Sequence, residues 1–394
     1  MIDLRSRLDA AATLPEDGAT GALAGRVFLP EVEGPAVVAV RPEGVFDISR
    51  RFATMRDLCE SDDPAAALRA ADGPRLGAFA DILANAAPEG RDPARPWLLA
   101  PVDLQAVKAA GVTFAVSMLE RVIEERARGD LTRAAAIRAE MTGLIGDDLS
   151  RLKPGSPEAQ KLKDHLIAIG AWSQYLEVGI GPDAEIFTKA QPLSAVGPGM
   201  DAGLHPVSTW NNPEPEIVIV VASDGRIVGA TLGNDVNLRD VEGRSALLLS
   251  KAKDNNASTA IGPLLRFFDS SFSLDDVRRA EVRLLVEGED GFRMEGSSSI
   301  SKISRDPADL ARQLLGAHHQ YPDGAVLFLG TMFAPIEDRD APGKGFTHKL
   351  GDVVAIATPK LGRLVNRMRL STECPPWTFG AAALMRNLSR RGLL

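Results

Sequence analysis

Three acidic residues are spaced so that one short folded segment could hold a cation. Glu214 and Glu216 are two residues apart, and Asp235 follows nineteen residues after Glu216. The run that begins at Ile217 is apolar and β-branched, which predicts a strand. Because alternate side chains of a strand point to the same face, we expect the carboxylates of Glu214 and Glu216 to lie on one side of it.

A hairpin would bring Asp235 to the same face. Asp224-Gly225 is a strong hairpin signal, and a second strand is expected from Arg226 to Leu232. With a two-residue loop, the numbers of cross-strand partners sum to 449, so Asp235 faces Glu214, with Glu216 on the adjacent diagonal. Carboxylates about 5 Å apart repel one another unless a cation neutralises them. A β-bulge, which the neighbouring prolines would allow, would change this register.

The expected ion is a hard one. All three ligands are oxygen atoms, with no His or Cys among them, which favours Mg²⁺, followed by Mn²⁺ or Ca²⁺. Three protein ligands on an octahedral ion leave positions for water or for a chelating substrate. The alternative is that the segment from Pro213 to Glu216 is a solvated loop. The strand and the hairpin that follow it favour the metal site.

Composition excludes several classes of protein. The chain has 394 residues with a formal net charge of −8 and a pI near 5.3, which argues against nucleic acid or an anionic membrane as a partner. The two cysteines, Cys59 and Cys374, are too few for a disulfide framework. The N-terminus has no apolar signal segment, and no apolar run approaches the ~20 residues that span a bilayer. We therefore expect a cytoplasmic protein.

The pattern of the chain predicts an α+β protein in three parts. Residues 1–103 mix strand-like runs with turns and an Ala-rich stretch, which predicts a small α+β domain. Residues 104–175 are expected to be helical, from apolar spacing between Leu104 and Ala115 and from Ser156-Pro157, a typical start of a helix. Residues 176–394 predict a β-rich domain. Its expected strands include Ile217–Ala222, Val282–Val286, Ala325–Leu329 and Val353–Ala357.

The C-terminal part resembles the fumarylacetoacetate hydrolase superfamily. The matching segments follow the family's order between about residues 175 and 368: Phe187-Thr188-Lys189, Glu214-Pro215-Glu216, Asn234 to Asp240, Lys253-Asp254, Gly262-Pro263, Gly330-Thr331 and Gly351-Asp352-Val353. This resemblance implies a mixed β-roll catalytic domain with a helical insertion. It also implies a divalent ion, usually Mg²⁺, on the carboxylates at 214, 216 and 235, a 2-oxo acid that chelates the ion, and a homo-oligomer.

The resemblance also implies roles for residues around the ion. Lys253 and Lys189 match positions that approach the substrate or its ion, and Arg239 matches one that contacts substrate or braces the metal loop. Gly330 and Thr331 match a segment near the substrate carboxylate. Glu242 falls where hydrolases of the family often carry a Gln that contacts substrate. For a single Lys or Arg a solvated surface role is the default, and the motifs favour the site for both lysines.

The expected lid departs from the family pattern. Hydrolases and many decarboxylases of the family carry a His-x-x-Glu pair there, whereas this chain has Ser117 and Glu120. A Ser without a base does not activate water in the same way, which disfavours hydrolysis. Ser117, Glu120, Arg121 and Glu124 share one helical stripe. Ser117 and Glu120 are candidates for proton handling or hydroxyl binding, while Arg121 and Glu124 fit equally well as a solvated ion pair.

The variant lid, the helical insertion and the length resemble one branch of the superfamily, the 2-keto-3-deoxypentonate (D-xylonate or D-arabinonate) dehydratases. The resemblance implies dehydration of such a sugar acid to 2-oxoglutarate semialdehyde through a metal-stabilised enolate. An acylpyruvate hydrolase or a 2-oxo-acid decarboxylase is the first alternative, favoured if His348 or His319 enters the pocket. The second is a non-enzymatic protein with a structural ion site, against which Lys253 and Lys189 argue.

Overall fold

The computed structural model describes most of the chain. The described residues are 2–128, 130, 133, 134, 136, 137, 152–168, 170, 172–333, 335, 337–341 and 345–394, without the side chains of 116 and 119. These residues form large sheets together with helices, so the predicted α+β class is confirmed. No helix among these residues is both long enough and apolar enough to cross a membrane.

The larger sheet has eleven strands in the described part of the chain. They are β1 (Leu23–Leu29), β2 (Gly34–Arg41), β3 (Gly44–Asp47), β4 (Arg75–Gly77), β5 (Trp97–Leu99), β6 (Ala106–Gly111), β7 (Glu185–Ala190), β10 (Pro215–Val221), β11 (Ile227–Asp235), β13 (Thr259–Phe267) and β16 (Ala325–Phe328). Neighbours follow the order β4-β3-β2-β1-β13-β11-β10-β16-β6-β7, and β5 also pairs with β1. Because β1 pairs with β13, one sheet joins the N-terminal residues to the C-terminal part.

A smaller sheet packs against the first. Its strands are β8 (Asp201–Leu204), β14 (Glu281–Glu287), β15 (Arg293–Ser299), β17 (Val353–Thr358) and β18 (Gly362–Leu370), in the order β15-β14-β17-β18-β8. Ile217 and Ile219 of β10 belong to the core cluster that contains Leu284 of the smaller sheet. Val218 and Val220 pack in a second cluster on the opposite face. The strand is therefore buried on both faces, as its continuous apolar run requires.

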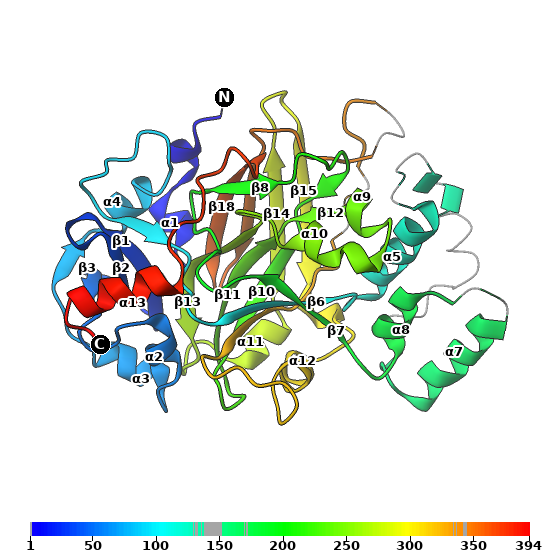
Figure 1. Cartoon of the computed structure of the whole chain (residues 1–394), viewed down its shortest axis with the longest axis horizontal. Coiled ribbons are helices and arrows are strands. Elements are labelled where there is room, and N and C mark those ends of the chain that lie inside the picture. The colour runs from blue at the N-terminus through cyan, green and yellow to red at the C-terminus, as the bar shows by residue number, and fades with distance from the viewer. Residues whose placement is uncertain are drawn as a thin grey trace.

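Helices lie at both ends of the sheets. The helices are α1 (Ala10–Thr13), α2 (Met55–Cys59), α3 (Pro64–Arg69), α4 (Phe79–Ala84), α5 (Ala115–Ala127), α7 (Pro157–Ala168), α8 (Gln174–Ile180), α9 (Arg239–Glu242), α10 (Leu249–Lys253), α11 (Leu274–Arg278), α12 (Pro307–Leu314) and α13 (Ala381–Arg390). Helices α5, α7 and α8 lie together at one end, and α13 lies beside the N-terminal strands at the other (Figure 1). There Asn387 donates hydrogen bonds to the carbonyls of Val32 and Glu33.

Most of the expected elements are present, with one clear error. All four strands expected in the C-terminal part are present, as β10, β14, β16 and β17, and Ser156 caps α7 by accepting a hydrogen bond from the Ala159 N–H (3.2 Å). The prediction of a helix between Leu104 and Ala115 is wrong: half of that segment is strand β6, which lies between β16 and β7. A strand buried on both faces carries apolar residues without strict alternation, and this pattern resembled helical spacing.

The hairpin has the predicted register next to the acidic residues. Pro215 pairs with Asn234 and Glu216 pairs with Gly233, so partner numbers sum to 449. The turn itself is longer than the two residues expected. The Ala222 carbonyl accepts a hydrogen bond from the Gly225 N–H, and the Ala222 N–H donates one to the Arg226 carbonyl. Val221 pairs with Ile227, one position out of register, and an irregularity after Val220 restores the pairing. A bulge at the turn thus compensates for the extra residue.

Candidate active site

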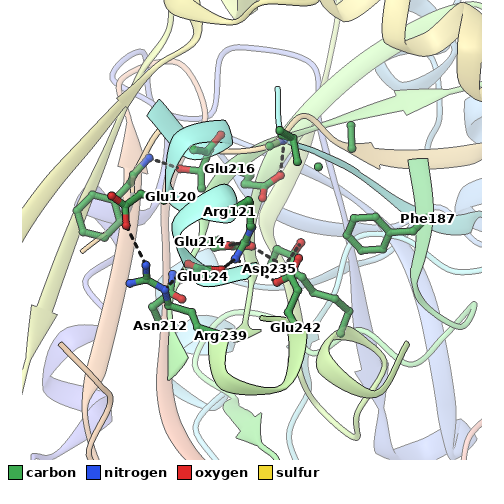
Figure 2. Close-up of a pocket in the computed structure, with 18 residues that line it drawn as sticks. Glu120, Arg121, Glu124, Phe187, Asn212, Glu214, Glu216, Asp235, Arg239 and Glu242 are labelled. Atoms are coloured by element: carbon green, nitrogen blue, oxygen red, sulfur yellow. Dashed lines mark hydrogen bonds and ion pairs between the residues drawn. The ribbon is translucent and has the colours of Figure 1, made fainter. Parts of the chain in front are cut away.

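The three carboxylates meet at one edge of the larger sheet. Glu214 directly precedes β10, Glu216 lies in β10, and Asp235 ends β11. One oxygen from each residue lies within 4.8 Å of one from each of the others, and all three residues are buried. The Asp235 N–H donates to the Glu214 carbonyl (3.0 Å), which locks the two strand ends together. The expected cluster is therefore present, and its side chains converge (Figure 2).

Two lysines balance part of the negative charge. Lys253, at the end of α10, places Nζ 2.6 Å from Glu214 Oε2 and 3.1 Å from Asp235 Oδ2. Lys189, on β7, places Nζ 3.1 Å from Asp235 Oδ1 and donates to the carbonyls of Lys253 (2.6 Å) and Ser258 (3.0 Å). Lys253 lines the pocket, whereas Lys189 lies behind Asp235 and is not part of the wall.

The pKa values of Glu216 and Asp235 are shifted in opposite directions. Burial, together with the charges of Asp235 and Glu214, holds the pKa of Glu216 well above its usual range. Burial acts against ionisation of Asp235 as well, but Lys253 and Lys189 outweigh it and lower the pKa of that carboxyl. Of these two carboxylates, Glu216 is therefore the one whose charge the neighbouring lysines do not offset. Buried oxygen ligands of this kind fit a hard divalent ion such as Mg²⁺.

Gly330 fixes the orientation of Glu216. Its N–H donates to Glu216 Oε2 at 2.6 Å, and its φ of +86° lies in the left-handed region that favours glycine. A Cβ at this position would lie 2.1 Å from Thr113 Oγ1 and 2.9 Å from the Ala110 carbonyl. Glycine is therefore required at 330 by both backbone conformation and space.

Helix α5 covers the cluster with its charged stripe. Arg121 places Nη2 2.6 Å from Glu214 Oε1, and Nη1 2.6 Å from Glu124 Oε2 and 3.1 Å from Glu242 Oε2. The pair between Arg121 and Glu124 that the sequence suggested is present but is not solvated, because Glu124 is 2% exposed. Burial alone would lower the pKa of Arg121, but the three carboxylates raise it well above its usual value. The guanidinium is therefore charged.

A second guanidinium extends this network. Arg239, the first residue of α9, donates from Nε to Glu124 Oε1 (2.6 Å) and from Nη2 to Glu120 Oε2 (3.2 Å). It also stacks on the ring of Trp210 at 4.3 Å. Glu242 ends the same helix, and burial raises its pKa to about 7, against the opposing charge of Arg121. Figure 2 shows Glu120, Glu124, Arg239 and Glu242 around the carboxylate cluster.

All but one of the site residues expected from the sequence line this pocket; the exception is Lys189. The wall contains Ser117, Glu120, Glu214, Glu216, Asp235, Arg239, Glu242, Lys253, Gly330 and Thr331. The pocket is also lined by Asn212, Phe187 and Phe333, for which the sequence predicted no role. Asn212 could have been found, because Asn211-Asn212 lies just before the acidic motif. Phe333 carried no signal beyond its nearness to Thr331.

The two histidines considered for the alternative chemistry lie elsewhere. His348 is fully buried with Nδ1 3.1 Å from Asp352 Oδ2, and its ring packs against Phe346. His319 borders a surface groove near α12. Among the described residues that line the candidate site, none is histidine. The pocket that the structure describes therefore lacks the His-dependent water activation of the family's hydrolases.

The fold and the site define a class of protein in which a buried three-carboxylate centre, suited to a hard cation, lies under a charged helix. The chain belongs to the fumarylacetoacetate hydrolase family: the family model described as "Fumarylacetoacetate (FAA) hydrolase C-terminal" matches residues 162–369, more than half of the chain.

Two curated proteins are similar in sequence. A 2-dehydro-3-deoxy-D-arabinonate dehydratase of Saccharolobus solfataricus is 32% identical over 188 residues, which is 47% of this chain and 58% of that protein. A probable 2-keto-3-deoxyxylonate dehydratase of Haloferax volcanii is 31% identical over 192 residues, 49% of this chain and 62% of that protein. The chain thus spans about three fifths of the curated relatives it matches.

Solved structures show the same fold. The apo form of a 2-keto-3-deoxy-D-arabinonate dehydratase matches with a TM-score of 0.63 at 20% identity, covering 88% of this chain and 99% of that one. A structure of a 2-keto-3-deoxy-D-arabinonate dehydratase described as complexed with magnesium and 2,5-dioxopentanoate matches with a TM-score of 0.62, at the same identity and coverage. At this identity the likeness establishes the fold of the chain.

Proposed function

We propose that the chain catalyses the Mg²⁺-dependent dehydration of a 2-keto-3-deoxypentonate, of the D-xylonate or D-arabinonate type, to 2-oxoglutarate semialdehyde. The observation that carries this proposal is the buried carboxylate centre beneath a lid that presents Ser117 and Glu120 in place of a His-containing pair. The names of the similar proteins support it, as does the 2,5-dioxopentanoate, another name for this semialdehyde, in one related structure.

The proposed ion ligands are Glu214, Glu216 and Asp235. When bound there, Mg²⁺ would polarise the carbonyl of a chelating 2-oxo acid and so make the adjacent C–H more acidic. Lys253 keeps its positive charge, because Asp235, Glu214 and Glu242 raise its pKa against the effect of burial. It is thus placed to offset the charge of the substrate carboxylate. Lys189 acts from behind the pocket by holding Asp235.

The wall residues would handle the groups that leave the substrate. Dehydration removes a proton from C3 and the hydroxyl from C4. A proton then moves from C5 to C3, and the enol so formed loses its O5 proton and gains a proton at C4, which gives the aldehyde. Glu120 and Ser117, on the face of α5 toward the pocket, are proposed to carry the proton and bind the hydroxyl. Gly330 and Thr331 would orient the substrate carboxylate, and Arg239 and Glu242 would bind the remainder of the substrate.

Acylpyruvate hydrolysis and 2-oxo-acid decarboxylation remain the alternatives on the same centre. They would be favoured if His348 or His319 entered the pocket, and neither residue lines it. A purely structural ion site is disfavoured because Lys253 contacts two of the three carboxylates, and a structural ion would not need a competing cation there. Dehydration is therefore the function that the geometry supports best.

A coupled assay tests the proposal. The protein is supplied with Mg²⁺ and 2-keto-3-deoxy-D-xylonate, and semialdehyde is followed by oxidation with an added dehydrogenase. We expect turnover that chelator or Glu216→Ala abolishes. Lack of turnover, together with pyruvate release from acetylpyruvate, would contradict the proposal and favour the hydrolase.

The organisation expected from the sequence belongs to the same proposal. We propose an α+β domain over residues 1–103, a helical lid over 104–175 and a mixed β-roll catalytic domain over 176–394. We also propose a cytoplasmic homo-oligomer that acts on a small sugar acid. Sedimentation with and without Mg²⁺ would test the assembly.

A further inference from the structure

The charges on the pocket wall are not balanced on the lid side. Besides the three carboxylates of the centre and Lys253, which pairs with them, the charged wall residues that the structure describes are Glu120, Arg121, Glu124, Arg239 and Glu242. Three of these are acidic and two are basic, and at pH 8 Glu242, whose pKa is about 7, is largely ionised. The other described side chains around the pocket, among them Phe187, Phe333 and Asn212, carry no charge.

Both guanidiniums on the lid side are already engaged by carboxylates. Arg121 binds Glu124 and Glu242 through Nη1, at 2.6 and 3.1 Å. Arg239 binds Glu124 through Nε and Glu120 through Nη2, at 2.6 and 3.2 Å. These groups are largely buried, and the weak screening in such surroundings strengthens every charge interaction. Among the described wall residues, a second anion on this side would therefore meet no cation that lacks an acidic partner.

We infer that Glu124 and Glu242, held in place by Arg121, form a charge filter for the far end of the substrate, admitting 2-oxo acids with a neutral tail and rejecting those with a second carboxylate. The inference rests on the proposed function, in which C1 and C2 of the substrate are held at the carboxylate centre. The rest of a five-carbon chain must then lie along the remaining wall. A hydroxyl or aldehyde there can hydrogen-bond without adding charge, whereas a carboxylate would add a fourth negative group.

Arg121 provides the competing possibility. Its Nη2 contacts Glu214, a proposed ion ligand, and ion binding at Glu214 would compete for that contact. A released Nη2 would offer hydrogen bonds to the tail of the substrate. Nη1 would still be shared between Glu124 and Glu242, so the balance of charge on this wall stays negative. The charge filter therefore predicts tighter binding of 2-oxo acids with a neutral tail. A carboxylate-binding Arg121 predicts tighter binding of those with a second carboxylate.

Binding of two five-carbon acids distinguishes them. 2-Oxopentanoate and 2-oxoglutarate have the same chain length and chelating end, and differ by one terminal carboxylate. Titration calorimetry of the full chain at pH 8 and fixed free Mg²⁺ is expected to show 2-oxopentanoate binding at least about tenfold more tightly. Glu242→Gln should reduce this ratio severalfold, and so should Glu124→Gln. Glu295→Gln, an exposed position on β15, serves as the matched control and should leave the ratio unchanged.

Two results would contradict the charge filter. Equal or tighter binding of 2-oxoglutarate by the unmodified protein would overturn the filter. If Arg121→Gln then weakened that binding, Arg121 would be the carboxylate receptor. Such a result would leave the proposed dehydration intact, because turnover of 2-keto-3-deoxy-D-xylonate is measured separately. If neither acid bound, the chelating site itself would be wrong, and the filter would fall with it.

Discussion

Arg121 Nη2 and Glu214 Oε1 lie 2.6 Å apart, so one ion pair joins the lid helix to the carboxylate centre. The other oxygen of Glu214 is held by Lys253 at 2.6 Å. Both oxygens of a proposed ion ligand are thus bound to cationic side chains. A divalent ion at this centre must displace or share these contacts, which couples the ion to the position of α5.

Removal of Arg121 should tighten Mg²⁺ binding. We expect Arg121→Gln to lower the Kd for Mg²⁺ by about three- to tenfold, because the side chain that competes for Glu214 is gone. Calorimetric titration measures the Kd, with Arg226→Gln as a control that removes an exposed positive charge elsewhere. Hydrogen exchange in α5 should respond to Mg²⁺ in the unmodified protein and much less in the variant. An unchanged Kd would show that the ion pair does not compete with the ion.

The Glu216→Gln variant should keep the stability of the ion-free protein but lose ion binding. Because burial and the neighbouring carboxylates raise the pKa of Glu216, the neutral carboxyl is favoured without an ion, and a glutamine keeps its shape without a charge. The melting temperature in chelator should therefore change little. The rise in melting temperature that Mg²⁺ produces by binding the folded state should disappear. A variant that still responded to Mg²⁺ would exclude Glu216 as a ligand.

Without a divalent ion, the protein should lose stability as the pH rises. Burial raises the pKa of Glu242 from its ordinary 4.5 to about 7, so the folded state retains a proton that the unfolded state releases. The contribution of this proton to the free energy of unfolding is fully present below pH 4.5 and is lost as the pH rises through 7. The contribution is at most about 3 kcal/mol.

Urea unfolding in chelator at pH 5 and pH 8 measures this dependence. Glu242→Gln should flatten it relative to the unmodified protein, because glutamine does not titrate. An equal slope in the two proteins would mean that Glu242 makes no contribution.

Gly330→Ala should be more harmful than the same change at another glycine with positive φ. At Gly330 a Cβ would lie 2.1 Å from Thr113 Oγ1, whereas at Gly225, with φ +90°, it would meet only Leu315 Cδ2, at 3.9 Å. Gly225→Ala therefore carries only backbone strain, of about 1–3 kcal/mol.

We expect Gly330→Ala to cost at least about 2 kcal/mol more than Gly225→Ala in the free energy of unfolding, and to weaken Mg²⁺ binding as the support of Glu216 moves. Equal losses of stability would show that Thr113 shifts to make room.

The carboxylate centre could be predicted from the sequence because strand periodicity is strict. Side chains alternate along a strand and cross-strand numbering is fixed, so Glu214, Glu216 and Asp235 could be placed together by counting. The three-residue turn would have shifted this register by one position. A bulge cancelled the shift, and nothing in the residues of the turn signals that compensation.

Contacts across the fold could not be predicted in the same way. The helical stripe that contains Arg121 was evident, but its partner Glu214 lies 93 residues further along the chain. Burial of that stripe depends on packing, so the choice between a solvated pair and a site residue stayed open. Strand β6 was mistaken for helix because its neighbours in the sheet, β16 and β7, lie far away in the sequence.

The way the lid leaves the sheet has a consequence for protein engineering. Strand β6 ends at Gly111 and β7 begins at Glu185, and these two residues pair with each other. The segment between these two residues, which contains α5, α7 and α8, therefore leaves the sheet and returns to it at adjacent backbone positions. Because its two ends are paired, this segment should be exchangeable as one unit between relatives, with junctions at Gly111 and Glu185. On the proposed function, such an exchange should transfer substrate preference while the strands that carry the proposed ion ligands stay in place.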